Sequence, residues 1–321
     1  MTAVDASRVP RVLPADRPSP PVYVDPNFTR AADWLADGTE DDPGVVVLGA
    51  PYAGGSISRA HCDAAPAAVR RALERFSTYS SDFDTSLDGL RAFDVGDLPR
   101  AVGAPVEEFQ RYIAEAIAAI RAQTEAPVVL IGGDNSVTVG GFRGSGADAM
   151  ITFDAHHDVR EWDEHGPTNG SPVRQLIEGG LGGSRVVQIG LHGFSNAETY
   201  ARYAAEAGIV GITAHSVRTI GIDAIVEEAL LKLEVAGATS VWVDVDLDCL
   251  ERALAPGAPA SMPGGLTPAE LERAAFRLGQ SPVVTGLDIT ELDPTIDVSE
   301  ATVRAACSVL LAFACGVAIR Q

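Results

Sequence analysis

Short apolar segments rich in β-branched residues recur along the chain, and within them apolar and polar residues do not alternate. They lie at residues 45–50, 128–131, 149–153, 186–189, 240–245 and 283–289. A strand with one face in water shows alternation, whereas a strand covered on both faces reads as a continuous apolar run. The pattern therefore predicts a sheet that is buried on both sides.

Segments with helical periodicity separate these apolar runs. Residues 105–121 and 221–236 each place apolar side chains along one stripe. A further helix is expected to begin after Thr267, which is followed by Pro268 and, at the third helical position, by Glu270. Strands joined through helices of this length imply right-handed crossovers. We predict an α/β fold, a three-layer α/β/α sandwich with a central, mostly parallel sheet.

The domain organisation follows from the composition of the N-terminal segment. Residues 1–26 are rich in Pro, Arg, Asp and Ser, and such a segment buries too little apolar surface to order itself. We expect a flexible N-terminal arm, or an arm laid on a neighbouring molecule. Because no linker or internal repeat interrupts the remainder, residues 27–321 are expected to form a single domain.

The balance of charges narrows the range of partners. The chain has 44 acidic and 24 basic residues among 321, a formal net charge of -20. A nucleic-acid or anionic-membrane surface needs clustered Lys and Arg, so neither partner is expected. The four cysteines are far apart, and the sequence shows neither a basic and apolar leader nor an apolar run of membrane length. We expect a cytoplasmic protein with reduced thiols.

Polar clusters follow four of the expected strands. They are residues 132–136 after the second apolar run, residues 154–158 after the third, Asp244 and Asp246 at the fifth, and Thr290 and Glu291 at the last. In an open parallel sheet, ligands bind beyond the carboxyl ends of the strands. We therefore expect these clusters to form one site at one edge of the sheet.

The acidic side chains of this edge predict bound metal. Two carboxylates about 4 Å apart repel by roughly 4 kcal/mol at an effective dielectric constant near 20. Divalent cations are the simplest means of neutralising such a cluster. Oxygen ligands with a single imidazole, that of His156, suit Mn²⁺ better than zinc. Because carboxylates can bridge, we expect two ions, which would activate water for attack on an electrophilic carbon or phosphorus. Hydrolysis is the predicted reaction class.

Four motifs occur in a fixed order. They are Gly-Gly-Asp-Asn-Ser at 132–136, Phe-Asp-Ala-His-His-Asp at 153–158, Asp-Val-Asp-Leu-Asp at 244–248 with Ala-Pro-Gly at 255–257, and Ile-Thr-Glu-Leu-Asp-Pro at 289–294. With these motifs the chain, from about residue 45 to the C-terminus, resembles the ureohydrolase family of arginase, agmatinase and formimidoylglutamase. The resemblance implies an arginase-like α/β fold and a centre of two manganese ions.

The resemblance also implies a set of metal ligands. Asp154 and Asp244 would bridge the two ions. Asp158 would complete the coordination of one ion, and His156 with Asp246 that of the other. Asp248 lies at the next alternate position, where a turn-forming role is an equally good expectation.

Two positions depart from the pattern of arginases, and both lie among the expected site residues. The family's histidine ligand to the first ion is replaced by Asn135, whose amide oxygen is a weaker ligand, so we expect that ion to be lost first. Asn169 stands where arginases and agmatinases place a histidine that shuttles protons, and formimidoylglutamases also lack that histidine. The expected catalytic residues are Glu291, which would face the amidine or guanidine nitrogen, and Asp246.

Further residues are expected to contact the substrate. Residues 172–175 and 193–196 look like those of formimidoylglutamase. Arg160 could pair bidentately with a substrate carboxylate, which glutamate derivatives have and agmatine lacks. The other expected substrate contacts are Asn169, Ser171 and His157, the last of which is also a candidate for a structural role.

The leading hypothesis is a hydrolase of a C–N bond in an amidine-type group, which converts N-formimidoyl-L-glutamate to L-glutamate and formamide. One alternative is an agmatine or guanidino-acid hydrolase that releases urea. Another is a metal-depleted binding subunit without activity, which the asparagine at position 135 motivates. Members of the family commonly form trimers or hexamers, so we expect a homo-oligomer that acts on a small molecule.

Overall fold

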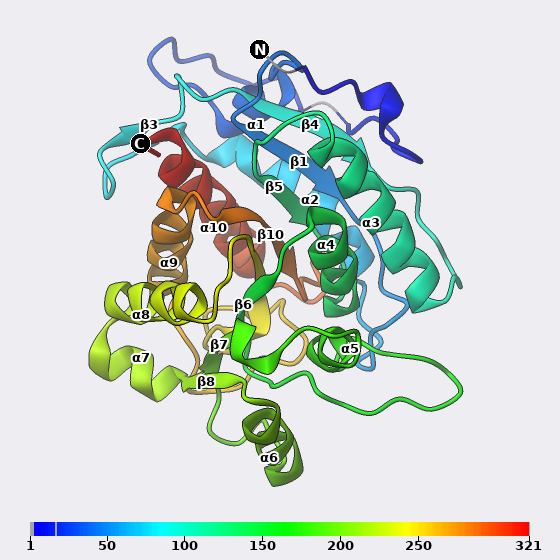
Figure 1. Ribbon diagram of the computed structural model, residues 1–321. Helices are drawn as coiled ribbons and strands as arrows, with labels where there is room; N and C mark the ends of the chain where they lie inside the picture. The colour runs from blue at the N-terminus through cyan, green and yellow to red at the C-terminus, as the bar shows by residue number, and fades with distance from the viewer. Residues whose placement is uncertain (1–2, 17, 321) are drawn as a thin grey trace.

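A computed structural model describes residues 3–16 and 18–320, and its centre is an eight-stranded sheet (Figure 1). The strand order is β4-β1-β5-β10-β9-β6-β7-β8, and every neighbouring pair is parallel. The strands are β1 (Val45–Gly49), β4 (Ala92–Asp97), β5 (Val128–Ile131), β6 (Ala149–Phe153), β7 (Val186–Leu191), β8 (Val210–Thr213), β9 (Val241–Asp246) and β10 (Val284–Thr290). The predicted parallel sheet is confirmed.

Helices cover both faces of this sheet, with α3 and α4 on one side and α8, α9 and α10 on the other (Figure 1). The helices are α1 (Ala31–Ala36), α2 (Ala65–Ala72), α3 (Val106–Arg121), α4 (Thr138–Ser145), α5 (Pro172–Glu178), α6 (Glu198–Ala207), α7 (Ala214–Ile220), α8 (Ile222–Val235), α9 (Pro268–Gln280) and α10 (Ala301–Ala318). Between α2 and β4, a short hairpin pairs β2 (Tyr79–Ser80) with β3 (Thr85–Ser86). The three-layer sandwich is therefore confirmed.

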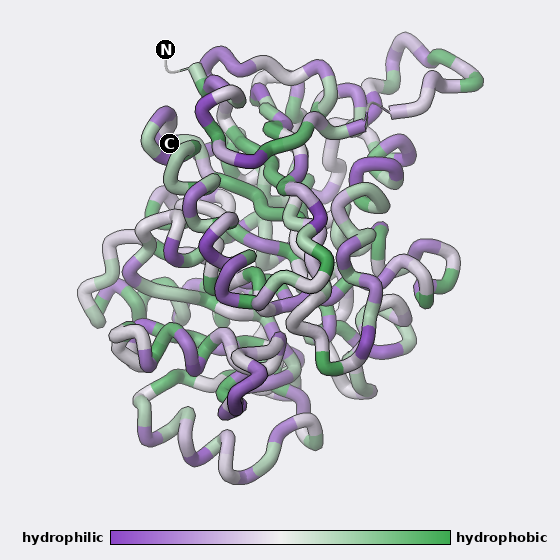
Figure 2. Tube along the Cα trace, turned by 90° about the vertical axis from the view of Figure 1, so that its right-hand side faces the viewer, coloured by the Kyte–Doolittle hydropathy of each residue, from purple (hydrophilic) through white to green (hydrophobic). Residues whose placement is uncertain are grey.

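The strands are apolar on both faces because successive side chains enter different helix layers. Val46 and Leu48 of β1 belong to the buried cluster that contains Phe109 of α3. Val45 and Val47 belong to the larger cluster that contains α2, α8, α9 and α10. Each face is thus fully covered, and the hydropathy-coloured trace shows the apolar segments gathered inside the molecule (Figure 2). This burial explains the continuous apolar runs of the sequence.

Two helices show how local sequence and packing cooperate. The predicted start of α9 is confirmed, since Thr267 and Glu270 form a reciprocal capping box and Pro268 is the first helical residue. The C-terminal α10 is long and apolar enough to cross a membrane, yet 72% of it is buried inside the protein. It packs against α9 and α2, so its apolar composition is that of a core helix.

The N-terminal segment, predicted to be a flexible arm, lies partly on the body of the molecule. Within its described residues, the side chains of Val4 and Val9 are buried against the α3 side of the core. The backbone of Leu13 exchanges hydrogen bonds of 2.7 and 2.8 Å with Asp97, which extends the sheet beyond β4. The following residues 22–24 are exposed. Residues 1, 2 and 17 of the predicted arm lie outside the described part of the chain.

Candidate metal centre

The four polar clusters meet at one edge of the sheet. They follow β5, β10, β9 and β6, which are consecutive in the strand order. A short 3₁₀ helix, η4 (Asn135–Val137), begins just after β5, and another, η6 (Leu247–Cys249), directly follows β9. Because parallel strands end at the same edge, segments far apart in sequence supply one buried site. The expected convergence is therefore confirmed.

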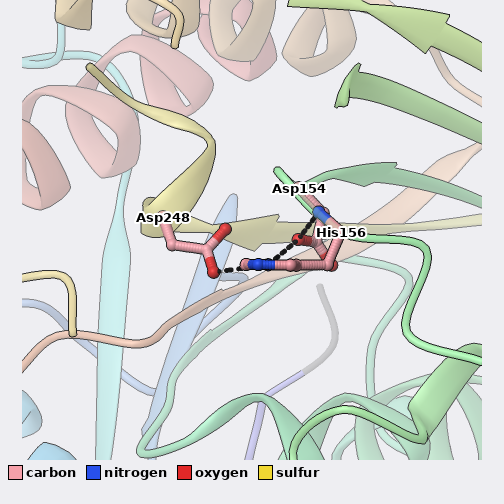
Figure 3. Close-up of side chains that lie close together, drawn as sticks. All are labelled: Asp154, His156 and Asp248. Carbon is pink, nitrogen blue, oxygen red and sulfur yellow. Dashed lines mark hydrogen bonds and ion pairs between the residues drawn. The ribbon is translucent and has the colours of Figure 1, made fainter. Parts of the chain in front are cut away.

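Two groups of ligand-type side chains share Asp154. One consists of Asp154, His156 and Asp248, and the other of Asp154, Asp158 and Asp246, with ligand atoms that lie within 4.8 Å of one another in each group. In the first group, Nδ1 of His156 lies 2.9 Å from Asp248 Oδ2 and 3.4 Å from Asp154 Oδ1 (Figure 3). The shared carboxylate makes this a candidate site for two neighbouring cations.

The loop after β6 is shaped to present these ligands. The backbone N–H of His156 donates to Asp154 Oδ1 at 2.6 Å, and the N–H of Ala155 donates to Asp248 Oδ1 at 3.1 Å. Asp158 adopts a left-handed backbone conformation, with φ at +51°. Such a conformation is costly for a residue with a Cβ and is found preferentially at functional sites.

The buried acids fit divalent cations. Burial, followed by the neighbouring Asp158 and Asp248 carboxylates, holds the pKa of Asp154 well above its ordinary value. Burial likewise raises the pKa of Asp158 to about 7 and that of Asp246 well above its ordinary value. The second oxygen of Asp154 is buried, and none of the described residues gives it a hydrogen bond. A cation would neutralise these acids and satisfy that oxygen, and oxygen donors with one imidazole suit Mn²⁺.

His156 is the imidazole of this set, and the carboxylates around it control its charge. Burial alone would lower its pKa, but Asp248 and Asp154 raise the pKa to about 12. A protonated imidazole then supplies the positive charge that the acids require. Bound metal would take over this role, since a histidine must be neutral to ligate.

The structure groups a different pair of aspartates from the one expected. Asp244, expected to bridge the ions, belongs to neither group and instead accepts hydrogen bonds from Thr152 at 2.8 Å and from Thr138 at 3.3 Å. It lies within β9, paired with strands on both sides, so its side chain sits below the sheet edge. Asp246 ends the strand and Asp248 lies in η6, which places both at the edge. The alternation of side chains along the chain fits Asp244 with Asp246 and equally fits Asp246 with Asp248. The residue at which β9 ends distinguishes these two pairs.

Asn135 is turned differently from a metal ligand. Its amide oxygen accepts hydrogen bonds from the hydroxyls of Thr138 at 2.8 Å and Thr290 at 3.1 Å, and its amide nitrogen donates to Asp158 Oδ2 at 2.8 Å. The donor group therefore faces the cluster, and the oxygen expected to coordinate metal faces away from it. In this arrangement Asn135 orients Asp158.

Glu291 lies beside the cluster with one oxygen held and the other free. Its Oε1 accepts hydrogen bonds from the backbone N–H of Asn135 at 2.8 Å and from the Asn169 amide at 2.9 Å. Its Oε2 is buried and has no hydrogen-bond partner in the part of the chain that the structure describes. Burial, and then the charge of Asp134, raises the pKa of Glu291 to about 8. The free oxygen is positioned to accept a hydrogen bond from a bound molecule.

A cavity connects these groups with some of the expected substrate contacts. Its lining includes Asp158, Asp246, Asp248 and Glu291, and also Arg160 and Asn169. Ser171 and His157 are absent from the lining. The Ser171 hydroxyl is buried beside Thr168, whose backbone N–H donates to it at 3.0 Å. Nδ1 of His157 lies 2.6 Å from Gln188 Oε1, a contact that favours the structural role considered for this histidine.

The cavity wall also contains residues that were not among the expected substrate contacts. Ile57, Ser58, Ser195, Asn196 and Tyr200 lie in its wall. Residues 193–196 were singled out by resemblance alone, and the loop at 57–58 carries no pattern that would distinguish it from other loops. Their place at the cavity depends on tertiary structure.

Comparisons with known proteins agree with this geometry. Residues 43–316 match the Arginase family. The formimidoylglutamase of Halalkalibacterium halodurans is 38% identical over 312 residues, which cover 93% of this chain and 95% of that protein. The formimidoylglutamase of Bacillus subtilis is 33% identical, with 90% and 92% of the two chains covered.

Solved structures give the same result. The crystal structure of the Bacillus subtilis formimidoylglutamase superimposes with a TM-score of 0.87 at 32% identity, covering 94% of this chain and 96% of that one. A Trypanosoma cruzi formiminoglutamase with Mn²⁺ superimposes with a TM-score of 0.83 at 26% identity, covering 92% and 100% of the two chains.

Proposed function

The chain belongs to the arginase family, and we propose that it is a manganese-dependent hydrolase that converts N-formimidoyl-L-glutamate to L-glutamate and formamide. The observation that carries the proposal is the pair of ligand groups sharing Asp154, with Glu291 in the same cavity. Two relatives at 38% and 33% identity are formimidoylglutamases, and a related structure contains Mn²⁺. These similarities favour the formimino substrate over guanidino compounds and over a subunit without activity.

We propose that two Mn²⁺ ions occupy the two ligand groups. Asp154 would contact both ions, Asp158 and Asp246 would hold one, and His156 and Asp248 would hold the other. Two such ions supply the nucleophile, because they lower the pKa of a water molecule, and they neutralise the buried acids. Asn135 would keep Asp158 in place through its 2.8 Å hydrogen bond, and Asp246 would serve catalysis as a ligand.

Glu291 would bind the formimino end of the substrate. An amidine is basic and cationic when protonated, and the unpartnered Oε2 of Glu291 can accept one of its N–H groups. Asn169 and the backbone of Asn135 hold the other oxygen, so the carboxylate is oriented before the substrate arrives. An amide cannot transfer protons as a histidine does, so Asn169 would position Glu291 and would not carry protons.

The reaction adds water across the formimino carbon and breaks the bond between that carbon and the glutamate nitrogen. The test is a substrate panel with the manganese-loaded protein, scored for both formamide and urea. We expect formamide and glutamate in equal amounts from N-formimidoyl-L-glutamate, and no urea from agmatine or guanidino acids. Urea release without formamide would refute the proposed substrate.

We also propose that the protein is a cytoplasmic homo-oligomer, a trimer or hexamer. The four cysteines are buried and unpaired, which suits a reducing compartment. Val22, Tyr23, Val24 and Phe28 expose apolar side chains near the N-terminus, and a neighbouring copy could cover them. Light scattering should give three or six times the chain mass of 33.5 kDa, and the mass of a monomer would reject this proposal.

A further inference from the structure

We propose that Ser195 and Tyr200 determine substrate specificity by binding, together with Arg160, the side-chain carboxylate of the substrate. This inference rests on the proposed function, since it concerns an N-formimidoyl amino acid with two carboxylates. All three residues line the cavity that contains Glu291 and the candidate metal ligands. They bring hydrogen-bond donors to a cavity whose lining also includes the acidic side chains of Asp158, Asp246, Asp248 and Glu291.

Arg160 is an arginine available to an acidic ligand. Within residues 3–16 and 18–320, no carboxylate lies within ion-pairing distance of its guanidinium. The next residue, Glu161, pairs instead with Arg174 at 3.2 Å, and Arg174 also pairs with Glu178 at 2.7 Å. In a chain with a net charge of -20, an unpaired arginine in the wall of the cavity is a natural partner for a substrate carboxylate.

The position of Arg160 is fixed relative to Glu291. Its backbone N–H donates to the Gly170 carbonyl at 2.9 Å, and a Cβ at position 170 would lie only 2.6 Å from Cδ of the arginine. Gly170 therefore lets the side chain lie along this segment. The preceding residue, Asn169, donates to Glu291. One short segment thus sets the spacing between the formimino-binding carboxylate and the guanidinium.

Ser195 contributes an unsatisfied hydroxyl. Its Oγ is buried and has no hydrogen-bond partner among residues 3–16 and 18–320, although the residue lines the cavity. A buried hydroxyl without a partner is costly, so such groups usually meet a ligand or water. The neighbouring Asn196 fixes the loop, because its amide accepts from the His157 N–H at 2.8 Å and donates to the Ala155 carbonyl at 2.9 Å. Ser195 is thereby tied to the metal-ligand loop.

Tyr200 of α6 closes the same wall. Its ring centroid lies 5.6 Å from the guanidinium carbon of Arg160, within the range of a cation–π contact. The ring contacts the arginine, and the phenol of this cavity-lining residue would be a further donor to the substrate. The side-chain carboxylate of the substrate is the one farther from the formimino carbon. It would therefore reach this wall while the formimino group lies at Glu291.

The test compares two substrates that differ at one group. N-formimidoyl-L-glutamine replaces the side-chain carboxylate by a neutral amide and keeps the rest of the molecule. For Ser195→Ala and Tyr200→Phe, we expect KM for the glutamate compound to rise about tenfold with kcat changed little, and KM for the glutamine compound to change less than about twofold. Ser195→Thr, which keeps the hydroxyl, should restore most of the affinity. The exposed Thr199, changed to Ala, is the control and should match the wild type.

Manganese content and the melting curve of each variant separate a local effect from misfolding. Equal rises in KM for both substrates, or no rise in either, would overturn the assignment of Ser195 and Tyr200. The assignment would also be overturned if a variant loses manganese or structure and Ser195→Thr does not restore these properties. A wild-type protein that binds manganese but hydrolyses neither compound would refute the proposed function itself, a result distinct from loss of discrimination between the two.

Discussion

Asp248 and Asp244 lie four residues apart, yet the structure gives them opposite roles. Asp248 contacts the imidazole of His156, whereas Asp244 is enclosed by threonine hydroxyls within the sheet. The sequence predicted Asp154, His156 and Asp158 because a single loop contains all three. It did not determine where the strand ends, and that end is the reason we propose Asp246 and Asp248 as ligands in place of Asp244. Side-chain alternation is the same in both registers.

The register can be tested by counting bound metal. Asp248→Ala should reduce manganese from two ions to about one per chain, because it removes a ligand of one group only. Asp244→Asn is the matched control and should keep two ions, since an amide can still meet the hydroxyls of Thr138 and Thr152. Metal analysis after gel filtration measures both. If Asp244→Asn loses an ion while Asp248→Ala keeps two, then Asp244 is a ligand and Asp248 is not, as the sequence alone suggested.

A substitution of Glu291 tests whether this residue binds the substrate or the metal. Glu291→Gln keeps the shape of the side chain but removes the ionisable carboxyl group whose free oxygen would accept from the amidine. We expect kcat/KM to fall by about 10²- to 10³-fold, a range typical for loss of one well-placed polar group in an active site, with manganese content unchanged. Steady-state kinetics and metal analysis on the same preparation measure the two effects. A parallel loss of manganese would make Glu291 a ligand.

At the level of elements, the sequence predicted the central strands and missed both edges of the sheet. β5, β6, β9 and β10 are buried on both faces and therefore appear as apolar runs. The edge strands β4 and β8 contain partly exposed residues and two glycines, so their sequences resemble loops. The site clusters were predictable because they follow the central strands. The wall formed by Ser195 and Tyr200 was not, because a loop and a helix place it there only in the folded chain.

The packing of the N-terminal segment on the core can be tested by its contribution to stability. Val4→Ala should lower the free energy of unfolding by about 1 to 3 kcal/mol, because it removes buried methyl groups from the core. Val22→Ala is the control, since that side chain is fully exposed and should change stability little. Urea denaturation followed by circular dichroism measures both. If the two variants are equally stable, the segment is a flexible arm as the sequence suggested.

For the whole molecule, the buried acids link folding stability to pH and to metal. Burial raises the pKa of Asp158 to about 7 and that of Glu291 to about 8 in the folded protein. A carboxyl with a raised pKa favours folding below its unfolded-state pKa, and this contribution is lost as pH rises through the folded-state pKa. The metal-free protein should therefore become less stable between about pH 4 and about pH 8.

Manganese should reverse this dependence, because the ions stabilise the ionised carboxylates. We expect added Mn²⁺ to raise the melting temperature far more at about pH 8 than at about pH 5, where protons compete for the ligands. Melting curves in chelator and in excess manganese, at both pH values, provide the comparison. Magnesium at the same concentration is the control for ionic strength. If manganese raises the melting temperature equally at both pH values, the ions do not bind to these carboxylates.

We infer that the two groups sharing Asp154 hold two manganese ions that serve the hydrolysis of N-formimidoyl-L-glutamate. Its most direct test is a titration of the metal-free protein with Mn²⁺, with formamide release followed at each addition. We expect no formamide in chelator and a rate that reaches its plateau at two ions per chain. Full activity in chelator, or two bound ions without formamide release, would contradict it.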